Sequence, residues 1–309
     1  MKKLFLAAGL IGLMSSSALA ANIGVSMALF DDNFLTVLRN GMQDYAKTLD
    51  GVNLQVEDAQ NDVAKQLSQM QNFIAQKVDA IIVNPVDTDA TPAMTKLAAE
   101  AGIPLVYVNR QPADLDKLPK NAAFVASNES DSGTLEAKQI CKLLGGKGDI
   151  VLMMGELSNQ AARQRTQDVH DVIATSDCSG MKIIQEQTGN WSRTQGQDLM
   201  TNWISAGTKF DAVVSNNDEM AIGAIQALKA AGYDMKKMIV GGVDATQDAL
   251  AAMKAGDLDV TVFQNAAGQG QGAVDTALKL AKGEAVDQKV WIPFELVTPD
   301  NMDKYLKKN

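Results

Sequence analysis

Residues 79–85 (DAIIVNP) and residues 211–218 (DAVVSNND) are two short apolar runs that each follow an aspartate and stop at asparagine. Each run is apolar throughout, which is typical of a strand buried on both faces of a parallel sheet. A helical pattern precedes both runs, so QMQNFIAQKVDAIIVNP and DLMTNWISAGTKFDAVVSNND align as helix, turn, strand and asparagine. The sequence therefore predicts two α/β halves that share a repeated unit.

The same alternation of strands and helices extends over the chain from residue 23 onward. Apolar runs predict strands at 23–28, 54–57, 80–83, 105–108, 124–126, 149–154, 182–187, 212–214, 238–242 and 260–263. Amphipathic patterns predict helices at 34–49, 63–77, 91–101, 132–144, 160–175, 194–206, 218–231 and 246–255. The predicted fold class is α/β, with two doubly wound parallel-sheet lobes.

Length and charge are consistent with a two-domain protein that is built for solubility. The chain has 309 residues, more than one compact core usually holds. Its formal net charge is −9, and it has no Lys/Arg cluster beyond the terminal Lys-Lys pairs. This balance argues against a nucleic-acid or anionic-membrane surface.

The first twenty residues have the pattern of a secretory signal peptide. Lys2 and Lys3 precede an apolar run at 4–14, and Ala18-Leu19-Ala20 forms a cleavage site. The apolar run is too short for a transmembrane anchor. We therefore expect cleavage after Ala20 and a periplasmic location.

Two cysteines, Cys141 and Cys178, would then mature in an oxidising compartment. Each lies near the carboxyl end of a predicted helix. Successive helices of α/β units run in the same direction, so a disulfide between the two would fit. Two buried free thiols are the alternative.

The sequence lacks the groups that catalysis needs. Its single histidine, His170, lies in the middle of a predicted helix, and Asp31-Asp32 has no second carboxylate at a defined spacing. No Gly-x-Gly-x-x-Gly follows the first strand, GQGQG at 268–272 lacks that fingerprint, and no Cys/His metal spacing occurs. We therefore expect neither an enzyme nor a bound cofactor or metal.

Polar residues instead follow several predicted strands directly: Asn84, Asn109-Arg110, Asn217 and Asp244. Ligands of open parallel sheets bind beyond the carboxyl ends of the strands. Two such sheets that face one another would direct these groups into one interlobe cleft.

Over essentially the whole mature length the chain resembles the periplasmic sugar-binding proteins of ABC transporters, in the ribose-binding-like branch (type I periplasmic binding protein fold). The resemblance is carried by DDNFLTVLRNGM, VEDAQND, VNPVDTDA, IPLVYVNRQ, AARQRTQ, SNNDEMAIGAIQALKAAG and VGGVDATQDAL. The runs VNRQP, ASNESDSGTLEA and QTGNWSRTQG look more like the inositol and rhizopine binders of that branch.

This resemblance implies a cleft lined by Asp32, Phe34, Asn84, Asn109, Arg110, Arg163, Trp191, Asn217, Asp244 and Gln264. A polyol has two apolar faces and a rim of hydroxyls, so Phe34 and Trp191 would supply walls and the polar residues a rim. Other roles stay open for five positions. Phe34 and Trp191 could simply pack, Asn84 could be a turn residue, Gln264 could belong to the hinge, and Arg165 could point inward in place of Arg163.

Two departures from ribose binders bear on the ligand: Asn109 replaces an aspartate, and Leu35 replaces a second phenylalanine. With Asp32 and Asp244 balanced by Arg110 and Arg163, the predicted pocket has no net charge, which suits a neutral ligand. We expect a neutral cyclitol, with myo-inositol first, or a neutral monosaccharide. The alternative is a ribose- or galactose-type sugar.

By the same resemblance, the lobes would close about a hinge of three crossing strands. The N-terminal lobe would comprise residues 21–127 and 265–295, and the C-terminal lobe residues 128–264 and 296–309. The expected partner is a membrane permease of an ABC transporter, with a chemoreceptor or sensor as the alternative, and the chain is expected to be a monomer.

Overall fold

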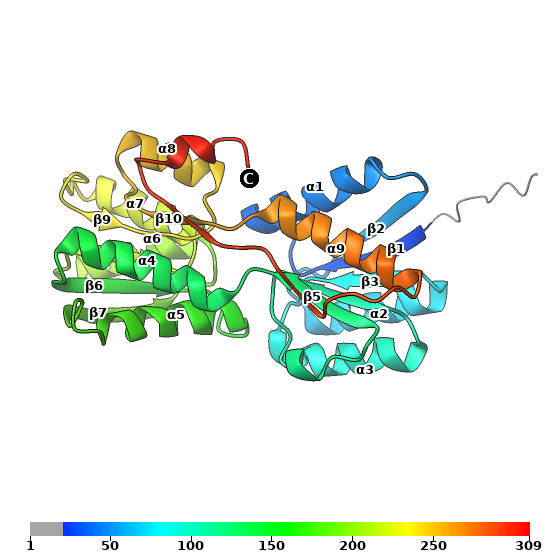
Figure 1. Ribbon diagram of the computed structural model, residues 1–309. Helices are drawn as coiled ribbons and strands as arrows, with labels where there is room; N and C mark the ends of the chain where they lie inside the picture. The colour runs from blue at the N-terminus through cyan, green and yellow to red at the C-terminus, as the bar shows by residue number, and fades with distance from the viewer. Residues whose placement is uncertain (1–20) are drawn as a thin grey trace, which may run out of the picture.

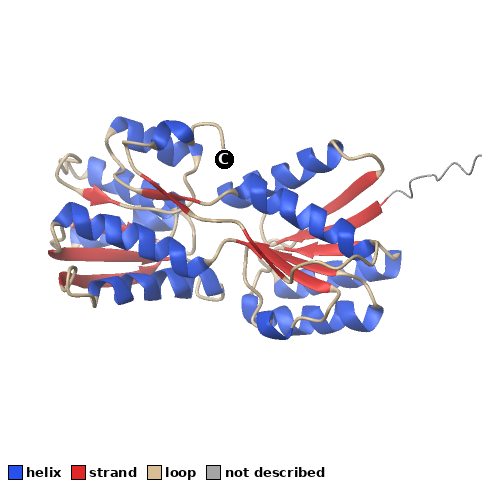
Figure 2. Ribbon diagram, in the orientation of Figure 1, coloured by secondary structure: helices blue, strands red, loops and turns tan. Residues whose placement is uncertain are grey.

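The computed structural model describes residues 21–309 as two α/β lobes that lie side by side (Figure 1). Each lobe contains a parallel sheet with helices packed against it (Figure 2). The predicted fold class is thereby confirmed. The predicted signal peptide, residues 1–20, lies outside the described residues.

The N-terminal lobe contains a six-stranded sheet in the order β11-β5-β4-β3-β1-β2, and every strand pair in it is parallel. Its strands are β1 (Ala21–Met27), β2 (Val52–Asp58), β3 (Ala80–Val83), β4 (Leu105–Val108), β5 (Ala122–Ala126) and β11 (Lys289–Trp291). Its helices are α1 (Asn33–Lys47), α2 (Val63–Gln76), α3 (Thr91–Ala101) and α9 (Ala266–Ala281), with short 3-10 turns η1 (Thr88–Ala90) and η2 (Leu115–Lys117).

Both faces of this sheet are buried. Ile82 of β3 packs in a core with α1 and α9, whereas its neighbours Ile81 and Val83 pack in a second core with α2 and α3. A strand that feeds two cores needs apolar residues at every position, which is why β3 does not alternate.

The C-terminal lobe contains a four-stranded parallel sheet in the order β7-β6-β8-β9. These strands are β6 (Lys147–Met154), β7 (Gly180–Thr188), β8 (Ala212–Ser215) and β9 (Ile239–Val240). Its helices are α4 (Glu129–Leu144), α5 (Gln160–Ile173), α6 (Arg193–Ser205), α7 (Asp218–Ala230) and α8 (Gln247–Ala255), with the 3-10 turn η3 (Met302–Lys304). An antiparallel pair, β10 (Thr261–Phe263) with β12 (Glu295–Val297), joins it through bridges at Gly241 and Asp244.

The chain passes between the lobes three times. It leaves the first sheet after β5 and enters α4, it runs from β10 into α9, and it returns between Trp291 of β11 and Glu295 of β12. These segments lie near the predicted crossings. The domain boundaries at 127/128, 264/265 and 295/296 remain our proposal.

The aspartate that opens each repeat ties its strand to the neighbouring strand. Asp79 Oδ2 accepts the backbone N–H of Asn22 in β1 at 2.7 Å. Asp211 Oδ2 accepts the backbone N–H of Asp149 in β6 at 2.8 Å. The same bond therefore fixes the entrance of the repeated strand in both lobes.

The asparagine that ends each repeat closes the same strand pair at its carboxyl edge. Asn84 Oδ1 accepts the N–H of Ala28, just past β1, at 3.3 Å. Asn216 Oδ1 accepts the N–H of Gly155, just past β6, at 3.0 Å. Both asparagines are fully buried. Asn84 is therefore the structural counterpart of Asn216.

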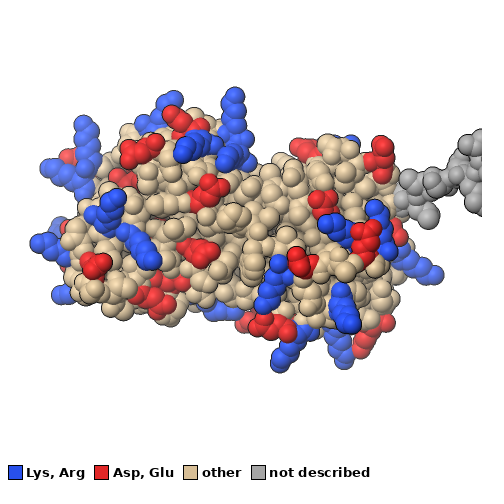
Figure 3. Space-filling model, viewed as in Figure 1, with Lys and Arg blue, Asp and Glu red and all other residues tan. Residues whose placement is uncertain are grey.

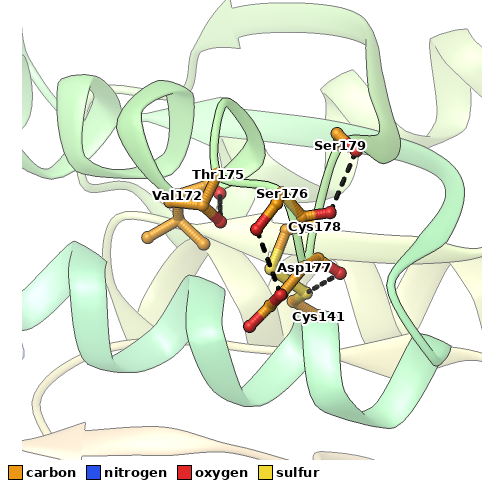
Figure 4. The surroundings of a disulfide bond; sticks show 7 residues. All are labelled: Cys141, Val172, Thr175, Ser176, Asp177, Cys178 and Ser179. Atoms are coloured by element: carbon orange, nitrogen blue, oxygen red, sulfur yellow. Dashed lines mark hydrogen bonds between the residues drawn. A yellow bond between two sulfur atoms is a disulfide. The ribbon is translucent and has the colours of Figure 1, made fainter.

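A disulfide joins Cys141, near the end of α4, to Cys178 in the segment after α5 (Figure 4). Both residues are buried. The two helices therefore meet at their carboxyl ends, and the alternative of two free thiols does not apply to this structure.

Charges of both signs are interspersed over the face of the molecule drawn in Figure 3. Among residues 21–309, no helix has the length and apolar character that crossing a membrane would require.

We predict that Asn84→Ala lowers the free energy of unfolding by about 1–3 kcal/mol, because the Ala28 N–H loses its acceptor inside the protein. Urea unfolding followed by circular dichroism would measure the loss. Asn202→Ala, at an exposed position of α6, is the control and should change stability by less than about 0.5 kcal/mol. Equal effects of the two changes would contradict the role assigned to Asn84.

Candidate functional site

A cavity lies between the lobes, where loops leave the carboxyl ends of both sheets. Protein atoms leave about 390 Å³ of space unfilled there, a figure that includes open solvent. The N-terminal lobe lines it with Asp32, Phe34, Leu35, Asn109 and Arg110, and the C-terminal lobe with Glu129, Ala161, Arg165, Trp191, Asn217, Asp244 and Gln264.

Asp32 enters the cavity from the end of the loop between β1 and α1, and Phe34 enters it from the first turn of α1. Asp32 is the N-cap of α1, and its Oδ1 accepts the N–H of Leu35 at 2.8 Å. Burial raises the pKa of Asp32 above its ordinary value, although this hydrogen bond and the attraction of Arg110 act in the opposite direction. The cap thus fixes one carboxylate oxygen at the start of α1, the helix that carries Phe34.

Asn109 and Arg110 follow β4 directly. Asn109 adopts φ 67°, a left-handed conformation that asparagine tolerates, and its Nδ2 donates to Gln269 Oε1 of α9 at 3.2 Å. Arg110 Nη1 donates to the carbonyl of Pro85 at 2.9 Å. Burial lowers the pKa of Arg110, and Asp32 and Glu156 counteract that effect. Both side chains are therefore oriented by the protein itself.

Arg165 and Glu129 form a buried two-pronged ion pair on the C-terminal side. Arg165 Nε donates to Glu129 Oε2 at 2.8 Å, and Nη2 donates to Oε1 at 3.2 Å. Gly133, one turn after Glu129, allows this contact, because a Cβ there would meet the Arg165 backbone. The close approach of α4 and α5 thus brings the pair to the cavity wall.

Asp244 and Gln264 supply further polar groups from the ends of adjacent strands. Asp244 is 3% and Gln264 1% exposed, and Gln264 Nε2 has no hydrogen-bond partner among the described residues. Burial raises the pKa of Asp244 well above its ordinary value, against the attraction of Arg165. A buried donor without a partner at a cavity wall is available to a ligand.

Trp191 forms an apolar wall that is held by the other lobe. Its Nε1 donates to Asn159 Oδ1 at 2.9 Å, and Asn159 Nδ2 donates to the carbonyl of Val86 in the N-terminal lobe at 2.9 Å. The indole also lies against Gly155, where a Cβ would collide with the ring. The orientation of Trp191 therefore depends on contact between the lobes.

The structure brings eight of the ten predicted site residues together at the cavity: Asp32, Phe34, Asn109, Arg110, Trp191, Asn217, Asp244 and Gln264. Their role in ligand binding remains a prediction. Asn217 is also the N-cap of α7, since its Oδ1 accepts the N–H of Met220 at 3.0 Å.

The structure places Arg163 outside the cavity. Its Nη2 pairs with Asp89 of the other lobe at 3.1 Å, and its side chain is 42% exposed. Arg165 lines the cavity in its place, because it lies four residues after Ala161 and so on the same face of α5. This correction follows the alternative that the sequence had left open.

Asn84 is the second predicted site residue that does not line the cavity. Its carboxamide is used within the protein, since Nδ2 donates to the Val108 carbonyl and to Asn109 Oδ1, both at 3.3 Å. The expectation that all the strand-end polar groups, including both Asn84 and Asn217, point into one interlobe cleft is therefore wrong for Asn84. Asn84 instead orients Asn109, which does reach the cavity.

Sequence reasoning missed Glu129 altogether, as well as Leu35 and Ala161 as lining residues. The sequence position of Glu129 could have indicated it, because Glu129 is the first residue of the helix that follows a lobe crossing. The lining consequently carries three carboxylates and two guanidinium groups, in place of the predicted two and two. Among residues 21–309, no group of His, Cys, Asp and Glu side chains could hold a metal ion.

Comparison with known proteins gives a family match over residues 23–285, to the family described as periplasmic binding protein domain. A protein of Rhizobium meliloti that carries the provisional name of rhizopine-binding protein is 68% identical over 309 residues, which is 100% of both chains.

Two solved structures of inositol-bound proteins are similar to the chain. An ABC transporter solute binding protein from Bacillus halodurans with bound myo-inositol has 42% identity and a TM-score of 0.89, covering 96% of this chain and 100% of that one. The Caulobacter myo-inositol binding protein bound to myo-inositol has 30% identity and a TM-score of 0.86, covering 95% and 98%.

We predict that Arg165→Met lowers the free energy of unfolding by about 3–5 kcal/mol, because Glu129 would stay buried without its partner. Arg163→Met, two residues away on the same helix, is the matched control and should cost less than about 1 kcal/mol, because its ion pair is exposed. Denaturant unfolding would measure both. Similar losses in the two variants would refute the distinction between the arginines.

Glu136 of α4 predicts a pH dependence of stability. Burial raises the pKa of Glu136 from 4.5 to about 8, and repulsion by Asp218 acts in the same direction. The hydrogen bond from the Ser215 N–H and the attraction of Arg165 lower the pKa but are outweighed. The folded state therefore holds a proton that the unfolded state releases. The resulting stabilisation is complete below about pH 4.5 and is lost as the pH rises through about 8, with a slope of up to about 1.4 kcal/mol per pH unit.

Glu136→Gln should remove this contribution, because glutamine does not titrate and still offers an oxygen to the Ser215 N–H. Urea unfolding at pH 5.5, 6.5 and 7.5 would measure the slope, with Glu100→Gln at an exposed position as the control. If the variant and the wild-type chain show the same change of unfolding free energy with pH, the pKa of Glu136 is not raised in the folded state.

Proposed function

The chain belongs to the periplasmic binding protein family, and from this premise we propose that it binds a cyclitol for an ABC importer, with myo-inositol as the first candidate. Members of the family bind solutes and are not enzymes, so the chain is not an enzyme. The family places it in the periplasm. Its export by a signal peptide cleaved after Ala20 is part of the proposal.

The observation that carries the proposal is the composition of the interlobe cavity. Phe34 from one lobe and Trp191 from the other offer apolar surfaces to the faces of a ring. Asp32, Asn109, Arg110, Arg165, Asp244 and Gln264 offer donors and acceptors to a rim of hydroxyl groups. The proteins with 42% and 30% identity to the chain have structures with myo-inositol bound.

Charge favours a neutral ligand when Asp244 is protonated. The lining has the carboxylates of Asp32, Glu129 and Asp244 and the guanidinium groups of Arg110 and Arg165. Burial raises the pKa of Asp244 well above its ordinary value, which favours its neutral form. With Asp244 protonated, two carboxylates and two guanidinium groups remain, so the lining has no net charge.

An aminated cyclitol is the second candidate, and one observation favours it. With Asp244 ionised, the lining has one carboxylate more than it has guanidinium groups, and an ammonium group would pair with it. The relative at 68% identity is provisionally named for rhizopine binding. A ribose- or galactose-type sugar remains the alternative from the wider family.

Contacts across the cleft support binding by lobe closure. The N-cap of α5, Asn159, makes no side-chain capping bond. Thr88 of the other lobe takes that role, since its Oγ1 accepts the N–H of Gln160 at 3.1 Å and donates to the Ser158 carbonyl at 2.9 Å. Closure thus completes the cap of α5, and ligand contacts from both lobes would favour it.

The family implies a membrane permease of an ABC transporter as the partner. We propose that the permease recognises the closed form of a monomeric chain. A chemoreceptor or sensor is the alternative partner of the same form, and the genes next to this one would distinguish the two.

Calorimetric titration would test the ligand. We expect binding of myo-inositol in preference to ribose, galactose and glucose, and no measurable binding by Arg110→Ala or Asp244→Ala. A thermal-shift screen gives a second readout, because a ligand at 100 times its dissociation constant adds about 2.7 kcal/mol of stability. Binding of ribose or a hexose alone would refute the cyclitol proposal.

Asp244→Asn separates the two cyclitol candidates, because it keeps the shape of the side chain and removes its charge. For a neutral cyclitol we expect an affinity loss below about tenfold, or about 1.4 kcal/mol. For an aminated cyclitol the loss should be larger, since the ammonium would lose its counter-charge.

A further inference from the structure

The backbone at Asp244 and Ala245 is strained. Asp244 has φ 124° and Ala245 has φ 51°, values that non-glycine residues rarely adopt. Such a conformation persists only when surrounding contacts hold it in place. Because Asp244 lines the cavity, the contacts that hold its backbone also set where its carboxylate points.

One of these contacts comes from Asn309, the last residue of the sequence. Asn309 Nδ2 donates to the Asp244 carbonyl and to the Gln264 carbonyl, both at 2.7 Å. Its Oδ1 accepts the N–H of Ala266, the first residue of α9, at 3.2 Å. A single carboxamide thus bonds to the backbone of two cavity residues and to the start of a helix in the other lobe.

Asn309 is itself held in place by the residues before it. Tyr305 packs against Phe263 with ring centroids 5.0 Å apart. Lys308 Nζ lies 4.8 Å from the centroid of Tyr305 and 5.3 Å from that of Phe263. The backbone oxygen of Asn309 accepts a bond from Gln247 Nε2 at 2.7 Å. The end of the chain lies between the lobes, near the crossing into α9 (Figure 1).

We propose that Asn309 is a positioning residue for the ligand site. Its side chain holds Asp244 and Gln264 in the orientation that the ligand requires. The inference rests on the proposed function, because it concerns the affinity of the same cavity. It adds a residue that does not itself line the cavity.

The chemistry of the side chain makes this role specific to asparagine. The two hydrogens of one amide nitrogen serve two carbonyls, and the oxygen serves one N–H. Aspartate keeps the acceptor but places a charged oxygen against two carbonyl oxygens. Alanine removes all three bonds. Both substitutions therefore release the strained backbone at Asp244.

Asn309→Ala and Asn309→Asp test the proposal, with Lys307→Ala as the matched control at an exposed position in the same segment. By calorimetric titration with myo-inositol, we expect both Asn309 variants to lose about tenfold in affinity, or about 1.4 kcal/mol. Lys307→Ala should bind as the wild-type chain does.

Hydrogen exchange of the ligand-free protein supplies a readout that does not depend on the ligand. We expect faster exchange in the Asn309 variants only in peptides that contain Asp244 or Ala266. Faster exchange throughout the C-terminal lobe would indicate a merely structural role and would overturn the proposal. Unchanged exchange, or wild-type affinity in both variants, would overturn it as well.

These results distinguish failure of the inference from failure of the proposed function. If the wild-type chain and Lys307→Ala bind no cyclitol or sugar, the proposed function fails. The exchange comparison then still decides whether Asn309 holds the Asp244 and Gln264 backbone.

Discussion

Two buried carboxamides, those of Asn84 and Asn216, each tie two neighbouring strands together at the carboxyl edge of their own sheet. Each accepts the N–H of the residue that follows the adjacent strand, so it sets where the next loop departs. In the N-terminal lobe that loop leads to Asp32 and Phe34, and Asn84 also donates to Asn109. The geometry of the cavity thus depends on bonds that lie behind it, which are screened from water and from any ligand.

The same arrangement explains why the polar lining is ordered without a ligand. Arg110 is held by the Pro85 carbonyl, Arg165 by Glu129, and Trp191 by Asn159. Groups that are already oriented lose little conformational entropy on binding, which favours both affinity and selectivity. Because the Asn159 bond to Val86 spans the lobes, one wall of the site is complete only when the lobes are in contact.

Local patterns predicted most of the elements but failed where packing overrides propensity. Residues 266–281 were not predicted as a helix, because GQGQG contains three poor helix formers. In the structure these residues form the whole of α9, where Gly270 lets the helix approach α1 near Leu38 and Met42. Arg163 was assigned to the cavity from its motif alone, yet the face of a helix that points inward depends on how the helix packs. Glu129 was missed because its ion-pair partner is 36 residues away, and only its position at the start of α4 pointed to it.

By itself, the sequence determined the fold class, the repeated unit and four of the cavity residues, Asn109, Arg110, Asn217 and Asp244, because buried strands and strand-end polar groups leave local signatures. The other four that reach the cavity, Asp32, Phe34, Trp191 and Gln264, were implied by the resemblance to sugar-binding proteins. Only the tertiary structure decided which asparagines face the cavity and which arginine does, and it alone brought Asn309 to Asp244. These choices depend on contacts between residues far apart in the chain. A side chain with both a donor and an acceptor looks the same in sequence whether it serves a ligand or its own backbone.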